Sequence, residues 1–569
     1  MKKKIGVYVC HCGGNISDYV DIEQVKQAVN DEGGVFLVKN TLFACADSAQ
    51  KEMVSDIEAN ELDAIVIASC SPKLHLNTFR NVAIRAGLNP YNYVQVNIRE
   101  QSSWAHSDNK KGATLKAIQL VKSGIARAEE SEALTSKTIP ASNAIIVIGA
   151  GVGEMRSALS LAEMGTEVYL IEKENTIGGH TANWGKLFPV NINGKDLVEK
   201  LYSEIKKRLN IKLFTNAQVI GRKGSIGNFD VEVQVGSEIL SIHVGAFILN
   251  TGFNPYEPVA GEYHYQEFEN VITLPEFKKL VDSSSEKLTY KGNVVKKIAY
   301  IYCVGSRQDE EGDNKYCSRF CCTSAIHTAI QAKNKFKNII NLHYNRGIRT
   351  YGKQELIYEE SSRNGDIYLQ FTLDSIPEIV KTGNKTIVKV KDILTEGKTL
   401  EAEVDLVVLV TGMVPRENKN IESLLKVPIG RDKFFNEIHM KLRPVETVID
   451  GVFIAGTCQS PKNIAETINS SMAAAAKANS VLTKGEISLE PVLAKLNPAN
   501  CTWCGKCAEL CSFDAIEKIE VDGRLVARIN ESNCKGCGMC TPVCPTDAID
   551  LAGFTNAQIE TMIDALAEN

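Results

Sequence analysis

Cysteine is the residue type with which this chain can do chemistry, because its thiols occur in sets of four. The chain has 569 residues and seventeen cysteines. In a protein that is not secreted, so many cysteines favour metal binding or redox chemistry over disulfides. One [4Fe–4S] cluster needs four thiolates. Only Cys458 stands outside the sets, which contain Cys10, Cys12, Cys45 and Cys70; Cys303, Cys317, Cys321 and Cys322; and eight cysteines between Cys501 and Cys544.

Two runs near the carboxyl terminus share the spacing C-x2-C-x2-C-x3-C. Three thiolates two residues apart can wrap one face of an iron–sulfur cube, and the fourth ligand comes from the other run. Structural zinc is the alternative, but zinc sites have no reason to repeat this spacing. Residues 490–553 therefore resemble a bacterial two-cluster ferredoxin module. The ligand sets that we predict are Cys501, Cys504, Cys507 and Cys544 for one cluster, and Cys534, Cys537, Cys540 and Cys511 for the other.

A glycine turn in the centre of the chain predicts a nucleotide site. An apolar strand over residues 144–150 leads into the turn, a helix follows, and a second strand ends at Glu172. In such a unit the glycines let the backbone approach a pyrophosphate, the helix amino terminus stabilises its charge, and the acid accepts hydrogen bonds from ribose hydroxyls. We expect FAD to be bound by Gly149, Gly151, Gly153, Glu172 and Gly179.

Later segments support the same fold. Residues 246–252, 406–412 and 452–456 each predict a buried strand that runs into a glycine turn, and an Ala-rich helix follows whose amino end would point at the flavin. This pattern resembles the thioredoxin reductase-like FAD fold over residues 143–485, an α/β class; an α/β domain without a cofactor is the alternative. The turns add four expected FAD-binding residues, which are Thr251, Gly252, Gly412 and Gly456.

Glu154 departs from the glycine fingerprint, because it stands where a third glycine allows close packing of helix and strand. A carboxylate about 5 Å from a phosphate charge costs roughly 3 kcal/mol at an effective dielectric of ~20. The gain from an acid in the first turn of a helix is only ~0.3–1 kcal/mol. The sequence leaves two outcomes: the side chain swings outward, or FAD binding is weakened.

A second nucleotide fingerprint is missing. The strand expected over residues 296–306 is followed by no G-x-G-x-x-G, and the flavoprotein region holds no C-x-x-C dithiol. The cysteines that follow have the spacing C-x13-C-x3-C-C, and we predict that they form a [4Fe–4S] site. A strained vicinal disulfide or two buried thiols at the adjacent Cys321 and Cys322 are the alternatives.

The first 135 residues alternate strands and helices, which predicts a small parallel α/β sheet. Cys10 and Cys12 follow the first expected strand, Cys45 follows the second, and Cys70 ends the third. Since the carboxyl ends of parallel strands share one edge, these four thiols can converge. A further [4Fe–4S] cluster is predicted there, with buried structural thiols or zinc as alternatives.

This combination resembles the HdrA-like family of heterodisulfide reductase subunits, the FAD- and iron–sulfur-containing, electron-bifurcating subunits of methanogens and many anaerobic bacteria. The resemblance is carried by VCHCGGNI, ASCSPKLH, NIREQSSW, the glycine turn, the C-x13-C-x3-C-C stretch, FIAGTCQSPKNI and the terminal module. It implies that the cysteines from Cys303 to Cys322 hold a cluster beside the flavin. The ferredoxin domain that some members carry inside the flavoprotein is expected to be absent, because residues 185–204 contain no cysteine.

The resemblance implies an oxidoreductase that distributes electrons from FAD to [4Fe–4S] clusters. It implies a hetero-oligomer, which can also be dimerised, with heterodisulfide reductase B- and C-like subunits, ferredoxin, and a hydrogenase, formate or NADH dehydrogenase module. No acid–base or nucleophile set is evident, so the catalytic residues stay unknown. Two alternatives remain: a relay or scaffold with weakened FAD binding, and a stand-alone NAD(P)H-dependent disulfide reductase.

Composition excludes other classes. The 64 basic and 69 acidic residues give a net charge of −5, which offers no electrostatic case for binding nucleic acid or an anionic membrane. No apolar stretch approaches the ~18 residues of a membrane span, and the amino terminus lacks the features of a signal peptide, so a cytoplasmic protein is expected. Residues 554–569 predict a helix that packs on its own domain or docks a partner. Near the expected flavin, Cys458 is interpreted as a packing thiol, and His327 as a helical residue that could face the ring.

Overall fold

The computed structural model describes residues 2–189, 191–310, 312 and 314–567. The chain forms two compact units: Met1–Ile139 together with Ser488–Asn569, and Pro140–Ile487. The two ends of the sequence thus share one unit, and the middle of the chain forms the other.

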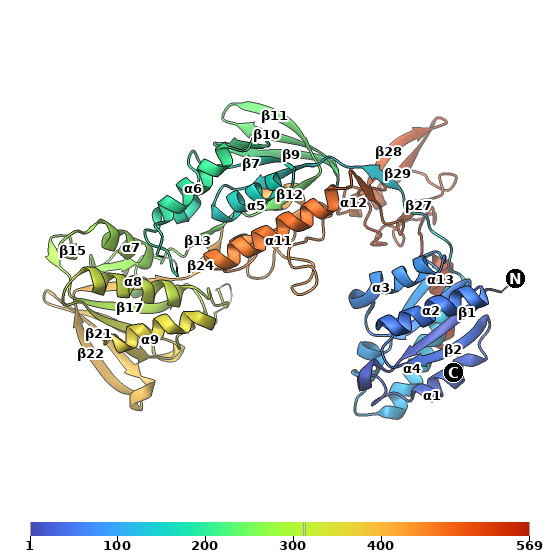
Figure 1. Ribbon diagram of the computed structural model, residues 1–569, viewed down its shortest axis with the longest axis horizontal. Helices are drawn as coiled ribbons and strands as arrows, with labels where there is room; N and C mark the ends of the chain where they lie inside the picture. Colours follow the sequence, from blue (N-terminus) through green and yellow to red (C-terminus); the bar gives the residue numbers. More distant parts are fainter. Residues whose placement is uncertain (1, 190, 311, 313, 568–569) are drawn as a thin grey trace. The chain divides into compact units, whose positions relative to one another are not determined.

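The amino-terminal part of the first unit is a four-stranded parallel sheet in the order β2-β1-β3-β4. The central strands β1 and β3 are buried along their whole length, as expected for a sheet with helices on both faces. Helices α1 and α4 lie on one face, and α2 and α3 on the other (Figure 1). The elements are β1 (Ile5–Cys10), α1 (Ile22–Asn30), β2 (Val35–Thr41), α2 (Asp47–Asn60), β3 (Ala64–Ser69), α3 (Pro72–Arg85), β4 (Tyr93–Asn97) and α4 (Lys110–Glu129). The predicted parallel α/β sheet is therefore confirmed.

The carboxyl-terminal part of the same unit is small and built from two antiparallel strand pairs. One pair is β27 (Ala494–Leu496) with β30 (Ile549–Leu551), the other β28 (Ile516–Val521) with β29 (Arg524–Ile529), and α12 spans Lys506–Leu510. Its core is a small apolar cluster in which several of the cysteines take part.

The carboxyl-terminal helix α13 (Asn556–Ala567) packs against α4 of its own unit. The Gln558 side chain donates a hydrogen bond of 2.8 Å to the Glu130 carbonyl oxygen. The Arg127 guanidinium lies 3.9 Å from the centre of the Phe554 ring, an arrangement that contributes a cation–π attraction. The helix predicted for the tail is thus present, and it covers its own unit.

The second unit contains two five-stranded parallel sheets, each with a three-stranded antiparallel sheet beside it. The first has the order β25-β12-β6-β7-β8 and the second β14-β23-β17-β18-β19. The strands of the first set are β6 (Ala144–Ile148), β7 (Glu167–Ile171), β8 (Ile211–Phe214), β12 (Ala246–Leu249) and β25 (Val452–Ile454), with β9 (Ala217–Ser225), β10 (Asn228–Val235) and β11 (Glu238–Val244). Those of the second are β14 (Val271–Thr273), β17 (Lys297–Val304), β18 (Ile340–Asn345), β19 (Ile367–Gln370) and β23 (Leu406–Thr411), with β20 (Glu378–Thr382), β21 (Lys385–Asp392) and β22 (Lys398–Val404).

Helices cover these sheets, and the short strands β13 (Phe253–Pro255) and β24 (Met413–Pro415) pair with each other where the chain passes between the two sheets (Figure 1). The helices are α5 (Val152–Glu163), α6 (Gly194–Lys206), α7 (Leu274–Ser283), α8 (Cys321–Lys335), α9 (Glu355–Arg363), α10 (Lys419–Leu425) and α11 (Ile464–Leu482). The α/β class that the sequence predicts is therefore present, with parallel sheets covered by helices.

Local sequence explains why the two helices of the first sheet begin where they do. Gly151 is the N-cap of α5, directly after the turn that ends β6. At α11, the Asn463 side chain accepts from the Glu466 backbone N–H at 2.8 Å, and the Glu466 carboxylate accepts from the Asn463 N–H at 3.0 Å. This reciprocal capping box fixes the first turn of α11.

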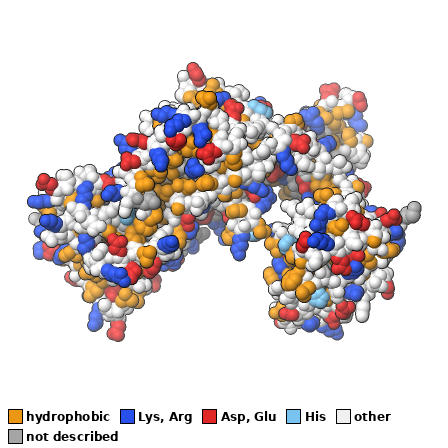
Figure 2. All heavy atoms as spheres, viewed as in Figure 1, with side chains coloured by type: hydrophobic (Ala, Val, Ile, Leu, Met, Phe, Trp, Pro, Cys, Tyr) orange, Lys and Arg blue, Asp and Glu red, His pale blue; other side chains and the backbone are white. Residues whose placement is uncertain are grey.

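The surface carries charges of both signs. On the face shown in Figure 2, lysine and arginine side chains alternate with aspartate and glutamate, and neither sign forms a continuous field. Among the described residues, no helix combines the length and the apolar character needed to cross a membrane.

Helix α4 approaches the sheet at Gly124, and this contact yields a stability prediction. A methyl group at Gly124 would lie 2.3 Å from Cγ2 of Val96, so Gly124→Ala forces the helix away from β4. Overpacking costs ~1–3 kcal/mol, which exceeds the ~1 kcal/mol that alanine gains in helix propensity. We expect a lower midpoint in calorimetric unfolding. Leu115→Ala, at a half-exposed position of the same helix, is the control and should change little; a raised midpoint for Gly124→Ala would contradict the packing.

Candidate functional site

A cavity of about 1690 Å³ lies in the second unit, and its wall contains the predicted glycine turns. All the residues expected to bind FAD line it except Gly456, whose neighbour Thr457 does. The amino end of α11 also borders the cavity, through Asn463, Ile464 and Thr467. The volume is larger than the ~300–1,000 Å³ of usual small-molecule pockets, which leaves room for a ligand of dinucleotide size.

The turn after β6 is formed by the small residues Gly149, Ala150 and Gly151. Gly149 has φ +105°, a conformation that glycine adopts without strain, and a methyl group there would lie 2.8 Å from the Asn250 carbonyl oxygen. Across the turn, the Gly178 N–H donates to the Ala150 carbonyl oxygen at 2.8 Å. The Gly151 Cα is the nearest atom that a methyl group on Gly179 would meet. The backbone can therefore approach a phosphate here, beside the positive end of the α5 dipole.

Glu172 fixes this turn. One of its carboxylate oxygens accepts from the Ala150 backbone N–H at 2.7 Å, and the other accepts from the Glu174 N–H at 3.0 Å. The side chain is buried yet lines the cavity. Each carboxylate oxygen has a second lone pair, so Glu172 can still accept from ribose hydroxyls as predicted.

Thr251 supplies an independent sign of a ligand. Its hydroxyl is buried in the cavity wall and has no hydrogen-bond partner within the part of the chain that the structure describes. A buried hydroxyl left unpaired costs ~1–3 kcal/mol. The glycine turn, two helix amino termini and this hydroxyl together fit a dinucleotide such as FAD.

Glu154 points inward. One carboxylate oxygen lies 2.8 Å from the position that a methyl group on Gly149 would take, and the other lies 2.8 Å from the corresponding position on Gly151. The residue is only 6% exposed. Burial raises the pKa of Glu154 to about 8, the Glu172 charge adds to this, and its own backbone N–H and Arg416 oppose it. Of the two outcomes left open by the sequence, the outward swing is wrong.

Cys303, Cys317, Cys321 and Cys322 come together at the carboxyl end of β17 and the first turn of α8. Burial raises the pKa of the Cys303 thiol and the charge of Cys322 adds to it, while Cys321 interacts with all three other members of the set. Cys303 has φ +64°, rare for a residue other than glycine and typical of strain at functional positions. All seventeen cysteines are free thiols, so a vicinal disulfide is absent.

Positive groups surround this quartet. The Arg307 guanidinium lies 3.7 Å from the Cys303 sulfur, the Arg346 charge lowers the pKa of that thiol, and the Arg319 backbone N–H donates to Cys317 at 3.3 Å. Cys322 has a lowered pKa because it accepts a hydrogen bond from Cys321. Donors of this kind are those that stabilise thiolates bound to iron.

Aromatic rings join the glycine turn to the quartet, and the sequence reasoning missed them. The His180 ring stacks on Trp184 at 5.8 Å, and Trp184 lies 6.5 Å from Phe320, which directly precedes Cys321. All these residues and Cys321 line the cavity. Their spacing follows no motif; only the position of Phe320 beside a cysteine offered a signal.

Two residues that the sequence singled out, His327 and Cys458, are buried and uncharged. His327 lines the cavity, its Nε2 lies 3.1 Å from the Asn191 side-chain oxygen, and burial lowers its pKa to about 4, so the ring is neutral at pH 7. Cys458 is buried and its thiol donates to the Ala455 carbonyl at 3.1 Å, with a pKa raised by burial to about 11. It behaves as a packing thiol.

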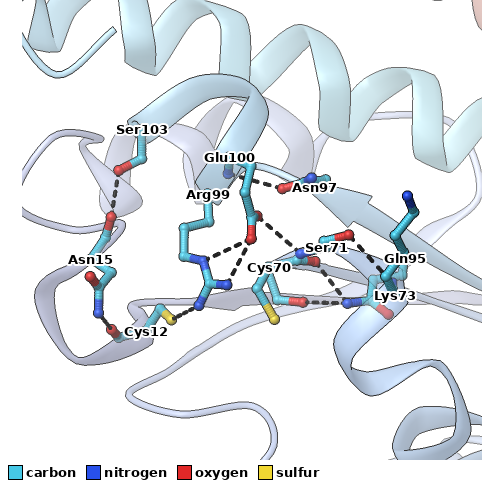
Figure 3. Close-up of polar contacts among 11 residues, drawn as sticks. Cys12, Asn15, Cys70, Ser71, Lys73, Gln95, Asn97, Arg99, Glu100 and Ser103 are labelled. Carbon is cyan, nitrogen blue, oxygen red and sulfur yellow. Dashed lines mark hydrogen bonds and ion pairs between the residues drawn. The ribbon is translucent and has the colours of Figure 1, made fainter. Parts of the chain in front are cut away.

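The amino-terminal cysteines lie near one another at the carboxyl edge of the β2-β1-β3-β4 sheet, and Figure 3 shows two of them, Cys12 and Cys70. The Cys10 sulfur accepts from the Cys12 N–H at 3.2 Å and the Ala44 N–H at 3.3 Å. Burial raises its pKa, and Cys12 and Cys45 add to this by their charge. Burial likewise raises the pKa of Cys70 to about 11, and Cys12 and Cys10 are among the charges that act on it.

Arg99 completes this edge, in the segment NIREQSSW. Its guanidinium donates to the Cys12 sulfur at 3.3 Å and pairs with Glu100 at 2.7 Å (Figure 3). Glu100 in turn accepts from the Ser71 N–H at 3.0 Å and so ties the loop after Cys70 to the arginine. A cation donating to a thiol of the quartet was not predicted, because the strand pattern says nothing of the loop after β4.

The eight carboxyl-terminal cysteines line two small cavities, four to each. One cavity is bordered by Cys501, Cys504, Cys507 and Cys544, the other by Cys511, Cys534, Cys537 and Cys540. Each therefore takes three thiols from one run and the fourth from the other. Backbone N–H groups of Ala527, Ala515 and Ala548 donate to the sulfurs of Cys501, Cys511 and Cys544 at 3.2–3.4 Å. Such donors fit thiolate ligands of iron–sulfur clusters. In the described ranges no three His, Cys, Asp or Glu residues are grouped to hold a single metal ion.

Comparison with known families agrees with the two kinds of site. Residues 494–551 match the family described as "4Fe-4S dicluster domain", and residues 144–185 match "FAD binding domain". The first range contains all eight carboxyl-terminal cysteines, and the second contains the glycine turn and Glu172.

Relatives align over most of their length. The A-type iron–sulfur subunit 2 of the CoB–CoM heterodisulfide reductase of Methanopyrus kandleri is 35% identical over 92% of this chain and 92% of its own. The A-type subunit of the H2:CoB–CoM heterodisulfide,ferredoxin reductase of Methanothermobacter marburgensis is 33% identical over 90% of each chain. Among solved structures, the thioredoxin reductase of T. acidophilum covers 59% of this chain and 97% of its own, with 18% identity and a TM-score of 0.42.

The contacts of Glu172 generate a binding prediction. Glu172→Ala removes two hydrogen bonds to a charged acceptor, each worth ~1.5–3 kcal/mol, and frees the glycine turn. We expect the dissociation constant for FAD, measured by fluorescence titration of flavin-free protein, to rise about 10–100-fold. Glu174→Ala is the matched control, because that exposed side chain forms a surface ion pair with Lys173, and it should leave affinity nearly unchanged. Equal effects of both variants would contradict the role of Glu172.

Proposed function

The chain belongs to the HdrA-like family of heterodisulfide reductase subunits, and from that membership we propose that it takes electron pairs from a donor module and delivers them singly, one to a ferredoxin and one to a disulfide-type acceptor. It is an iron–sulfur flavoprotein subunit of an oxidoreductase. The observation that carries the proposal is that the glycine turn and Cys321 line one cavity. A flavin and a cluster held there would be close enough to exchange electrons.

When bound, FAD can take up two electrons together and release them one at a time, whereas each [4Fe–4S] cluster exchanges a single electron. The residues of this chain set the conditions for both. Glu172 holds the turn and accepts from the ribose, Thr251 offers its free hydroxyl, and Arg307 and Arg346 offset the charge of the thiolates. A positive charge near a cluster favours the reduced state, so these arginines raise its reduction potential.

We assign four clusters to the chain. Cys10, Cys12, Cys45 and Cys70 bind one within residues 1–135, and the set from Cys303 to Cys322 binds another within residues 143–485. Two more belong to residues 490–553, and residues 554–569 form the tail. The convergence of thiols at the sheet edge, the arginines, and the two cysteine-lined cavities support this assignment.

The names of the relatives support the partners. They describe reductases that act on the CoB–CoM heterodisulfide with H2 or formate, and several include ferredoxin. We propose that this chain works with B- and C-like subunits, a ferredoxin, and a hydrogenase, formate or NADH dehydrogenase module in a hetero-oligomer.

A second candidate is an electron relay without bound flavin, and the inward carboxyl of Glu154 is the observation that favours it. A stand-alone NAD(P)H-dependent disulfide reductase has no such support. In the second sheet, β17 runs into Cys303 and the loop toward α8, where a nucleotide-binding domain would have its glycine turn.

Iron and flavin counts separate the candidates. Protein purified without oxygen should contain about sixteen iron atoms and about one FAD per chain. Cys322→Ala should lower the iron to about twelve, whereas Cys458→Ala, which changes another buried thiol of the same unit, should leave it unchanged. About sixteen iron atoms with no flavin would support the relay, and about eight would leave only the carboxyl-terminal module.

Coupling tests the division of electrons. In the chain assembled with its partner subunits and supplied with donor, reduction of ferredoxin should stop when the disulfide-type acceptor is withheld. When that acceptor is returned, ferredoxin reduction should resume, with one electron going to ferredoxin for each electron that goes to the disulfide-type acceptor. We would measure both products spectroscopically in the same cuvette. Ferredoxin reduction that proceeds at full rate without the second acceptor would show a simple relay and refute the proposed division.

A further inference from the structure

Glu154 occupies the place at which this fold holds an anion. It is in the first turn of α5, and its carboxyl folds back over Gly149 and Gly151 toward its own backbone N–H. In glycine-turn nucleotide sites the pyrophosphate lies at the amino terminus of this helix. The carboxyl therefore stands beside, or in, the space of the phosphates, and it lines the cavity from which they would enter.

The groups that face Glu154 come from every element packed around the turn. Glu172, directly after β7, is the like charge, and Arg416, after β24, is the opposite charge. Cys458 in the short helix η8 (Gly456–Cys458) is close enough to sense the charge of Glu154, but burial keeps its thiol protonated. The adjacent Gly153 is packed by uncharged side chains, those of Asn250 after β12 and of Thr467 and Ser471 on α11.

Two protonation states give opposite outcomes at this position. A carboxylate next to a phosphate is repelled, and little water is present to screen the two charges. A neutral carboxyl has an O–H that can donate to a phosphate oxygen, and a hydrogen bond with a charged partner is worth ~1.5–3 kcal/mol. The same side chain can therefore either hinder or hold the ligand.

We propose that Glu154 makes flavin binding proton-dependent: its neutral carboxyl admits the pyrophosphate of FAD and donates a hydrogen bond to it, whereas its carboxylate excludes it. The inference rests on FAD occupying the glycine turn. It also explains how a glutamate can replace the third glycine of the fingerprint without abolishing the site.

The direction of the pH dependence follows from linkage. The pKa of Glu154 is raised by burial to about 8 in the flavin-free chain, and a phosphate beside it raises the pKa further. Below that pKa the carboxyl is already neutral, so the affinity is independent of pH. Above it, binding must take up a proton, and the affinity falls by up to about tenfold for each pH unit.

Titration of the flavin-free full-length chain with FAD between pH 6 and pH 9.5 tests this. The dissociation constant should be flat up to about pH 7 and rise about tenfold per unit above pH 8. Glu154→Gln, a permanent mimic of the neutral acid, should bind FAD with little change over the whole range. Glu163→Gln, at the exposed far end of the same helix, should behave like the wild type. Calorimetric titration at pH 9 in two buffers should show uptake of a proton by the wild type and none by Glu154→Gln.

The outcomes separate the inference from its premise. If the wild type and Glu154→Gln lose affinity in parallel as the pH rises, Glu154 does not gate binding and the inference fails, while flavin binding stands. If neither they nor Glu154→Gly, which restores the third glycine, binds FAD at any pH, the flavin site itself is wrong. Should Glu154→Gln not fold, Glu154→Gly takes its place and should likewise bind independently of pH.

Discussion

Negative charge held inside the protein is the constraint on which this structure depends. Most thiols of the four quartets, the glycine turn and Glu154 place anions, or groups that become anions, where little water reaches. An isolated buried charge is too costly to keep, so each site provides donors. The donors are backbone N–H groups at Cys10, Cys501, Cys511 and Cys544, guanidinium groups at Cys12 and Cys303, and helix amino termini at the turn. The architecture supplies these donors by ending strands and beginning helices at the same edges.

The sequence predicted the fold well, because its signals were local and strong. The apolar runs that we expected as strands became β6, β12, β17, β23 and β25, and the doubled cysteine spacing was enough to pair three thiols of one run with the fourth of the other. Local patterns could not predict side-chain direction. The sequence left two outcomes open for Glu154, and its inward position became clear only with Asn250 and Glu172 around it. Arg99 and Trp184 were missed because their partners, Cys12 and Phe320, are far away in the sequence.

The two parallel sheets of the second unit end differently. The first is followed by the glycine turn after β6, whereas in the second β17 carries Cys303 near its carboxyl end and the chain continues to the cysteines of α8. His180, Trp184 and Phe320 fill the cavity wall between them with rings.

The exposure of Cys45 has a practical consequence. The other members of the amino-terminal quartet are buried or half-buried, but Cys45 lies open to solvent. A sulfur that water reaches is also reached by dioxygen and peroxide, and thiol oxidation follows exposure. Oxidation of the amino-terminal quartet is therefore expected to begin at Cys45. Loss of that one sulfur as a ligand would break up a cluster held by the four thiols while leaving the rest of the chain intact.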